Sequence, residues 1–199
     1  MSTPPSQGKL LYHITHIDNI QSILKYGLLS RNKLENLKSV IFKDIADQDI
    51  IEKRKEQLLQ NYVLFHFFSK NPFDGNVCQK YGSENMAIIA IYRPIDKTNF
   101  FIIPTHPLDV NKDPDIYPYD EGFKLINWDI IDDLQNRDYH DPIIRKACMA
   151  ECLCAVSINP KNIAYIYVYS DEIKEKLIKK IPSGYIKIIS VNSKMFPKT

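Results

Sequence analysis

Apolar residues form several short runs, some continuous and some alternating with polar residues, and this pattern predicts a chain rich in strands. The predicted strands cover residues 10–12, 62–68, 86–92, 99–104, 151–156, 162–169 and 185–191. The runs at 62–68 and 86–92 have no polar side, which indicates strands buried on both faces.

Helical spacing begins directly after the first strand. Thr15 or Asp18 can cap this helix with a side-chain oxygen, and Gly27 stands where a helix needs a residue of positive φ to end. The residues that repeat at helical spacing are Ile17, Ile20, Ile23 and Leu24. Further helices are predicted over 44–60, 127–134 and 171–180, and long loops over 71–82 and 106–121. Mixed strands and helices without an internal repeat predict one α+β domain over residues 1–199, with residues 1–8 flexible.

Polar side chains gather where the first strand is expected to end. They are His13, Thr15 and His16. Because a helix begins immediately afterwards, its free N–H groups and these side chains could together hold a small polar ligand. An ordinary strand–helix unit with structural polar residues explains the same pattern.

Composition leaves several function classes open. Hydrophobic residues make up 44% of the chain, enough for a packed core. The net charge of +2 is too small to require a nucleic-acid partner, although it allows a local basic groove. Lys53, Arg54 and Lys55 form a basic cluster inside a predicted helix. They form either a solvated helix face or a site where one arginine turns into a cleft to meet a phosphate, carboxylate or base edge.

Cysteine spacing and hydropathy bear on metals and membranes. Cys78, Cys148, Cys152 and Cys154 contain no CxxC pair, so we expect no metal site. We see no signal peptide and no long apolar run, and we therefore expect a cytoplasmic protein that does not associate with a membrane.

Glu151 is the least expected residue in its surroundings. It opens an otherwise apolar strand, where a carboxylate is unfavourable unless it has a partner or a function. Burial would raise its pKa, which suits a general base or a group that holds a sugar hydroxyl. The alternative is a structural glutamate paired with Arg145 or Lys146.

Several segments follow one another in a recognisable order between residues 11 and 156. They read LYHITHIDNIQSILKYGLL, IADQDIIEKRKEQL, YVLFHFFSKNPF, NWDIIDD and RKACMAECLC. In this order and spacing they resemble the DarT family, which comprises DNA-targeting ADP-ribosyltransferase toxins usually paired with a DarG-type antitoxin. The first and last segments carry most of the specificity.

The resemblance implies an ADP-ribosyltransferase fold, in which a central split mixed or antiparallel β-sheet with flanking helices binds NAD in a cleft. It implies that Glu151 and Arg54 are the catalytic residues. It also implies that His13 and Thr15 contact the nicotinamide–ribose end of NAD, and that Ile14 between them belongs to the cofactor site. The rest of the NAD pocket is then expected at Asn19, Ser22, Gly27, Leu28 and Ser30.

The activity implied by the resemblance is mono-ADP-ribosylation of guanine or thymine in single-stranded DNA, with NAD consumed and no metal needed. The protein would be the toxin of a toxin–antitoxin pair, a monomer whose partners are single-stranded DNA and a DarG-like macrodomain antitoxin with ADP-ribosylglycohydrolase activity. Lys70 stands where family members commonly have arginine, which favours guanine over thymine. Transfer to RNA or protein, or a non-catalytic nucleic-acid-binding module, are the alternatives.

Overall fold

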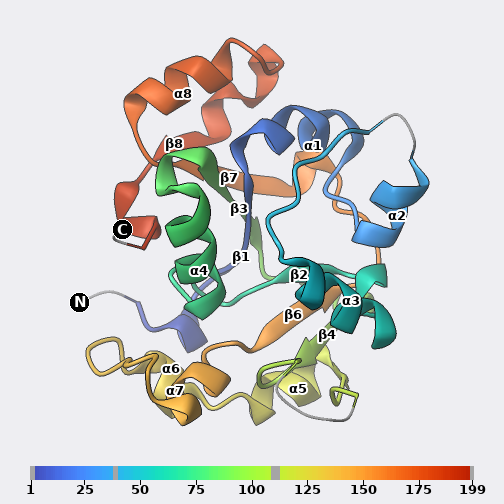
Figure 1. Cartoon of the computed structure of the whole chain (residues 1–199), viewed down its shortest axis with the longest axis vertical. Coiled ribbons are helices and arrows are strands. Elements are labelled where there is room, and N and C mark those ends of the chain that lie inside the picture. Colours follow the sequence, from blue (N-terminus) through green and yellow to red (C-terminus); the bar gives the residue numbers. More distant parts are fainter. Residues whose placement is uncertain (1–2, 38–39, 109–112, 198–199) are drawn as a thin grey trace.

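Two four-stranded sheets lie at the centre of the computed structural model, which describes residues 3–37, 40–108 and 113–197 (Figure 1). The first sheet has the order β1-β3-β7-β8, formed by Leu10–His16, Met86–Tyr92, Ile163–Val168 and Ile189–Val191. The second has the order β2-β6-β4-β5, formed by Val63–Phe65, Glu151–Cys154, Phe100–Ile103 and Tyr117–Pro118. Among the described strands, only β7 and β8 pair in parallel. The predicted α+β architecture with a split, largely antiparallel sheet is confirmed.

A backbone bridge joins the two sheets. The N–H of Tyr12 in β1 donates to the carbonyl of His66 at 2.9 Å, and the N–H of His66 donates back to Tyr12 at 2.8 Å. The chain leaving β2 therefore turns from its own sheet to β1.

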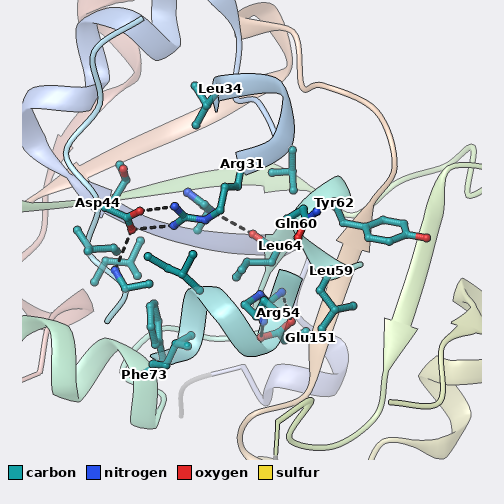
Figure 2. A pocket seen from close by; sticks show the side chains of 18 of the residues that line it. Arg31, Leu34, Asp44, Arg54, Leu59, Gln60, Tyr62, Leu64, Phe73 and Glu151 are labelled. Atoms are coloured by element: carbon teal, nitrogen blue, oxygen red, sulfur yellow. Dashed lines mark hydrogen bonds and ion pairs between the residues drawn. The ribbon is translucent and has the colours of Figure 1, made fainter. Parts of the chain in front are cut away.

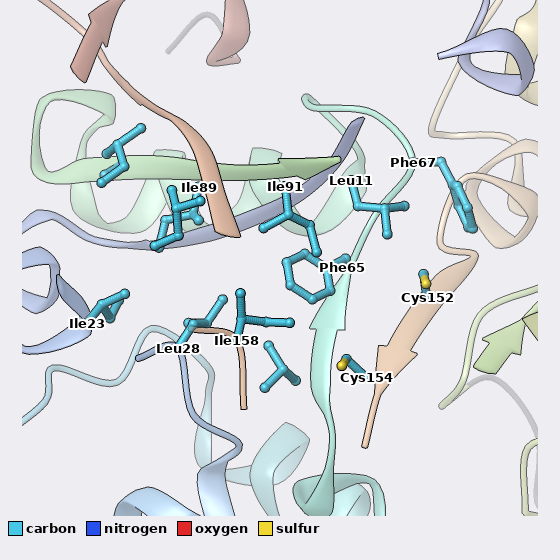
Figure 3. Close-up of a cluster of buried hydrophobic side chains, with 14 of the residues drawn as sticks. Leu11, Ile23, Leu28, Phe65, Phe67, Ile89, Ile91, Cys152, Cys154 and Ile158 are labelled. Carbon is cyan, nitrogen blue, oxygen red and sulfur yellow. The ribbon is translucent and has the colours of Figure 1, made fainter. Parts of the chain in front are cut away.

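The main core fills the space between the sheets. Every residue of β3 except Tyr92 is buried. Leu11 and Ile91 of the first sheet face Phe65, Cys152 and Cys154 of the second (Figure 3). Each large apolar side chain buried in this way contributes about 1.5–3 kcal/mol to folding.

Helices surround both sheets. They are α1 Ile20–Tyr26, α2 Arg31–Asn36, α3 Gln48–Glu56, α4 Pro72–Tyr81, α5 Tyr119–Leu125, α6 Trp128–Asp132, α7 Pro142–Ala147 and α8 Asp171–Ile178. Short 3-10 helices cover Pro5–Gln7, Ile17–Asn19, Leu59–Asn61, Ser83–Asn85, Pro160–Asn162, Ser183–Ile188 and Ser193–Met195. Within the described ranges, no helix is long and apolar enough to cross a membrane.

Several predicted boundaries were wrong. The first strand runs on to His16, so the polar residues expected after it lie within it. The helix predicted over 44–60 is shorter because Leu58 adopts a φ of 58°, which ends the helical path. The segment 185–191 is mostly 3-10 helix, and only its last three residues form a strand.

Two predicted loops contain helices. Most of residues 71–82 form α4, because the Asn71 side chain caps the helix by accepting the N–H of Asp74 and Pro72 occupies the first helical turn. Within 106–121, a short strand at 117–118 leads directly into α5.

The beginning of the chain was expected to be flexible, but its described residues are anchored. Pro5 is buried, and the guanidinium of Arg93 donates to the carbonyls of Pro5 and Ser6. Ser6 in turn donates through its N–H and hydroxyl to the carboxylate of Asp132.

Candidate functional site

A cavity of about 460 Å³ brings together all but one of the site residues predicted from sequence (Figure 2). The exception is Ser30, which lies outside the lining. The predicted residues that line the cavity are His13, Ile14, Thr15, Asn19, Ser22, Gly27, Leu28, Arg54 and Glu151. They come from β1, from α1 with the residues that flank it on both sides, from α3 and from the start of β6.

Arg54 and Glu151 form a bidentate ion pair in this cavity (Figure 2). Nη1 contacts Oε1 and Nη2 contacts Oε2, both at 3.0 Å. Glu151 is only 2% exposed, and burying its charge is unfavourable. The two parallel hydrogen bonds from the guanidinium compensate this cost. Its partner is therefore Arg54 rather than Arg145 or Lys146. Of the basic cluster, Lys53 and Arg54 both line the cavity, and Arg54 is the less exposed of the two.

Two histidines in the wall are held neutral. The Nδ1–H of His13 donates to the Leu64 carbonyl at 2.9 Å, and desolvation lowers the pKa of His13 to about 4. The Nδ1–H of His66 donates to the Ala150 carbonyl at 3.1 Å, and burial lowers the pKa of His66 although Glu151 acts in the opposite direction. In both rings Nε2 keeps its lone pair. The sequence analysis missed His66, whose signal was a histidine inside an apolar strand.

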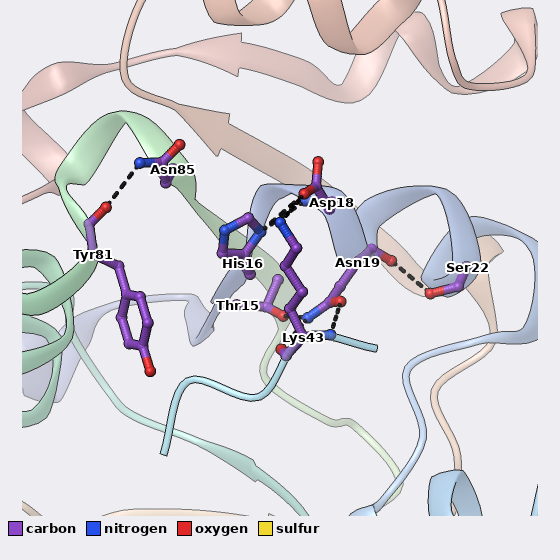
Figure 4. A network of polar contacts seen from close by, with 8 residues as sticks. All are labelled: Thr15, His16, Asp18, Asn19, Ser22, Lys43, Tyr81 and Asn85. Atoms are coloured by element: carbon purple, nitrogen blue, oxygen red, sulfur yellow. Dashed lines mark hydrogen bonds and ion pairs between the residues drawn. The ribbon is translucent and has the colours of Figure 1, made fainter. Parts of the chain in front are cut away.

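Asn19 holds one wall of the cavity through its side-chain amide (Figure 4). Its Oδ1 accepts the N–H of Lys43 at 2.8 Å, while its Nδ2 donates to the Lys43 carbonyl at 2.8 Å and to the Thr15 hydroxyl at 3.0 Å. The hydroxyl of Ser22 donates to the Asn19 carbonyl at 2.9 Å. These protein contacts already use both ends of the amide that was expected to face NAD.

An ion pair also fixes this wall of the cavity. Arg31 at the start of α2 binds the Asp44 carboxylate with both terminal nitrogens, and its Nη2 lies 2.8 Å from Oδ1 (Figure 2). Asp44 also accepts the N–H of Ala46 at 3.1 Å. Residues 40–46, which we call the strap, are thereby fixed to both β1–α1 and α2.

Gly27 shapes the path of the backbone beside the cavity. Gly27 has a φ of 93°, and a Cβ there would lie 2.8 Å from the Ile158 carbonyl oxygen. Leu28 and Ile158 exchange both backbone hydrogen bonds next to it. Ser30 is buried at the N-terminus of α2, and its hydroxyl has no hydrogen-bond partner among the described residues.

Lys70 does not line the cavity, although Pro72 and Phe73 do. Its side chain is exposed, its φ is 64°, its N–H donates to Asp74 at 2.8 Å, and its carbonyl accepts the Tyr139 hydroxyl at 2.9 Å. The residue on which the preference for guanine rested is thus not among those that line the cavity.

Basic groups border the cavity near Glu151. His106 and Arg145 line it and also line an adjoining hollow of about 170 Å³, together with Lys146, which like Arg145 lies in the last turn of α7. Such groups suit a phosphate or a base edge. Within the described part of the chain, no cluster of three or more His, Cys, Asp or Glu side chains is arranged for a metal ion.

A family model described as "ssDNA thymidine ADP-ribosyltransferase, DarT" matches residues 12–197. The chain belongs to the DarT family. A curated relative, the DNA ADP-ribosyl transferase-DNA ADP-ribosyl glycohydrolase fusion protein of Thermosipho africanus, is 32% identical over 186 residues. The match covers 90% of this chain and 47% of that protein, so the chain spans about half the length of the relative.

Solved DarT structures share the fold. Thermosipho africanus DarTG in complex with ADP-ribose matches with a TM-score of 0.76 and 27% identity, over 95% of this chain and 51% of the other. Thermus sp. 2.9 DarT in complex with ADP-ribosylated ssDNA matches with a TM-score of 0.78 and 21% identity, over 99% and 100%. Its complex with NAD+ matches with a TM-score of 0.72 and 20% identity, over 96% and 98%. The expected ADP-ribosyltransferase fold is confirmed.

Proposed function

We propose that this DarT-family chain transfers ADP-ribose from NAD to a thymidine base in single-stranded DNA. The observation that carries the proposal is the buried Arg54–Glu151 pair in a cavity that also contains His13 and Thr15. Membership of a family described by this activity supports it. That description names thymidine, and Lys70 gives no reason to prefer guanine.

The cavity suits NAD as the donor. Its volume lies in the range of about 300–1,000 Å³ typical of small-molecule sites, and its walls combine apolar side chains with a few fixed polar groups. The neutral His13 offers a ring nitrogen that can accept a hydrogen bond, as the carboxamide N–H of nicotinamide requires. Ile14, Thr15, Ser22, Gly27 and Leu28 are proposed as the remaining contacts.

NAD supplies the ADP-ribose group and releases nicotinamide. Glu151 is proposed to hold a ribose hydroxyl and to stabilise the positive charge that develops on the sugar as the bond to nicotinamide breaks. Arg54 orients this carboxylate through both nitrogens and lies where it can also meet the edge of the incoming base. Because Glu151 is buried, its charge acts more strongly on the sugar than it would in solution.

The substrate and partners follow from the same site. A base reaches a buried carboxylate only after it leaves the stack, which favours single-stranded DNA, and His106 and Arg145 border the approach. We propose that the chain acts as a monomeric cytoplasmic toxin. We also propose that its partner is a macrodomain antitoxin that hydrolyses the ADP-ribose–base bond, as suggested by the fusion of transferase and glycohydrolase in the relative.

The test combines purified protein, NAD and single-stranded oligonucleotides, with intact mass and nicotinamide release as readouts. We expect one added ADP-ribose on an oligonucleotide with thymidine, none on a matched one without it, and none with Glu151→Ala. Glu175→Ala, an exposed position on α8, is the control and should behave as the wild type. Nicotinamide release without DNA modification would move the acceptor to RNA or protein. Neither product would favour a binding module.

A further inference from the structure

We propose that His66 is a positioning residue that sets the place of Glu151 relative to β1. The inference rests on the proposed function, because it takes Glu151 as the catalytic glutamate. His66 is 2% exposed and lines the same cavity. It is the residue at which the chain passes from one sheet to the other.

The ladder between β2 and β6 stops just before Glu151. Its last pair is Phe65 with Cys152, so the next pair would join His66 to Glu151. The backbone of His66 instead makes both of its hydrogen bonds to Tyr12. On the opposite edge, the ladder between β4 and β6 still includes Glu151, paired with Ile103. The start of β6 therefore loses a backbone partner on the side that faces β2.

The imidazole of His66 replaces that partner. Its Nδ1–H donates at 3.1 Å to the carbonyl of Ala150, the residue before Glu151. One residue is thereby bonded to β1 through its backbone and to the entry of β6 through its side chain. Since β1 carries His13 and Thr15, the distance between the proposed NAD contacts and the catalytic carboxylate depends on this residue.

This role requires the imidazole to carry its proton on Nδ1. A carbonyl accepts hydrogen bonds, so the proton must be on Nδ1 and the lone pair on Nε2. A neutral ring adds no positive charge beside Arg54, and it leaves the ion pair with Glu151 undisturbed. The ring also lies 6.5 Å from that of Phe73, centroid to centroid, which helps to fix its orientation.

Three substitutions of His66 separate the effect of its hydrogen-bond donor from the effect of the shape of its ring. His66→Asn places an amide N–H near the position of Nδ1, His66→Gln places it near Nε2, and His66→Phe keeps a ring without a donor. Loss of a neutral hydrogen bond corresponds to a rate loss of about tenfold. We expect kcat to fall about tenfold in the Phe and Gln variants, with KM for NAD changed less than about threefold, and to stay within about threefold of wild type in the Asn variant.

The control is His140→Phe, an exposed position, which should leave both constants unchanged. A purely structural role would instead give losses that follow the melting temperature, with no rescue by asparagine. Wild-type kcat in the Phe variant, or equal losses in the Asn and Phe variants, would overturn the proposal.

A second readout does not depend on activity. Hydrogen–deuterium exchange of the amides at 150–154 should be faster in the Phe variant and near wild type in the Asn variant. If the wild-type protein neither releases nicotinamide nor modifies DNA, the proposed function fails. The exchange data then still decide whether His66 holds the entry of β6, and unchanged exchange in the Phe variant would refute that role.

Discussion

The Arg54–Glu151 pair makes a prediction that separates its contribution to folding from its contribution to activity. Glu151 is 2% exposed, and the Arg54 side chain is 12% exposed. Removing one partner of such a pair typically destabilises a protein by about 3–5 kcal/mol, because the other charge is left buried without compensation. Replacing both partners with apolar side chains of similar volume is often neutral.

We therefore compare Glu151→Leu and Arg54→Met with the double variant, in which both side chains are apolar. Glu151→Leu leaves the Arg54 guanidinium without an acceptor, so the loss of stability should be at least about 3 kcal/mol. For a chain of this length that loss corresponds to roughly 6–12 °C in melting temperature. The double variant should lose less than either single variant. All three should lack transferase activity.

Urea unfolding followed by tryptophan fluorescence measures these losses. The chain has a single tryptophan, and Trp128 packs against Phe67 and Phe123 with ring centroids 5.3 Å and 4.7 Å away. The double-mutant cycle should give a coupling free energy of more than about 3 kcal/mol between the two positions, because the double variant loses less than either single variant. If the losses of the single variants simply add in the double variant, the reasoning about a compensated buried pair is refuted.

Three further predictions concern the surroundings of the cavity. Asn19→Leu removes the hydrogen bonds that hold the strap at Lys43. We expect KM for NAD to rise about tenfold or more, with a smaller effect on kcat, in an assay of nicotinamide release. An unchanged KM would contradict the role of the strap. Burial raises the pKa of Asp74 to about 7, so the folded state binds its proton more tightly than the unfolded state. This group should make stability fall as pH rises from about 4 to about 7. In Asp74→Asn, the free energy of unfolding measured with urea should decline less between about pH 4 and pH 7. An equal dependence on pH in both proteins would argue against this role of Asp74. Leu58 is exposed and has a φ of 58°, a strained conformation for leucine that glycine adopts freely. Leu58→Gly should therefore raise the free energy of unfolding by about 0.5–1 kcal/mol. A lower melting temperature would count against this.

Local patterns in the sequence predicted most of the secondary structure. The strand at Met86–Tyr92 and the helix at Asp171–Ile178 follow from apolar runs and helical spacing. The helix at Pro72–Tyr81 had the sequence signal of an Asn-Pro start, but its glycine and polar residues favoured a loop. Its burial against the first sheet, through Val77 and Cys78, outweighs those weak helix formers.

The sequence by itself also identified Glu151, because a carboxylate in an apolar strand is unfavourable without a partner. Only the tertiary structure decided that the partner is Arg54, which lies 97 positions away, rather than a neighbouring basic residue. It likewise decided that Asn19 holds the strap and that His66 joins the two sheets. Spacing along the chain reports neighbours within one element, whereas these contacts depend on sheet register and on the path of the chain between elements.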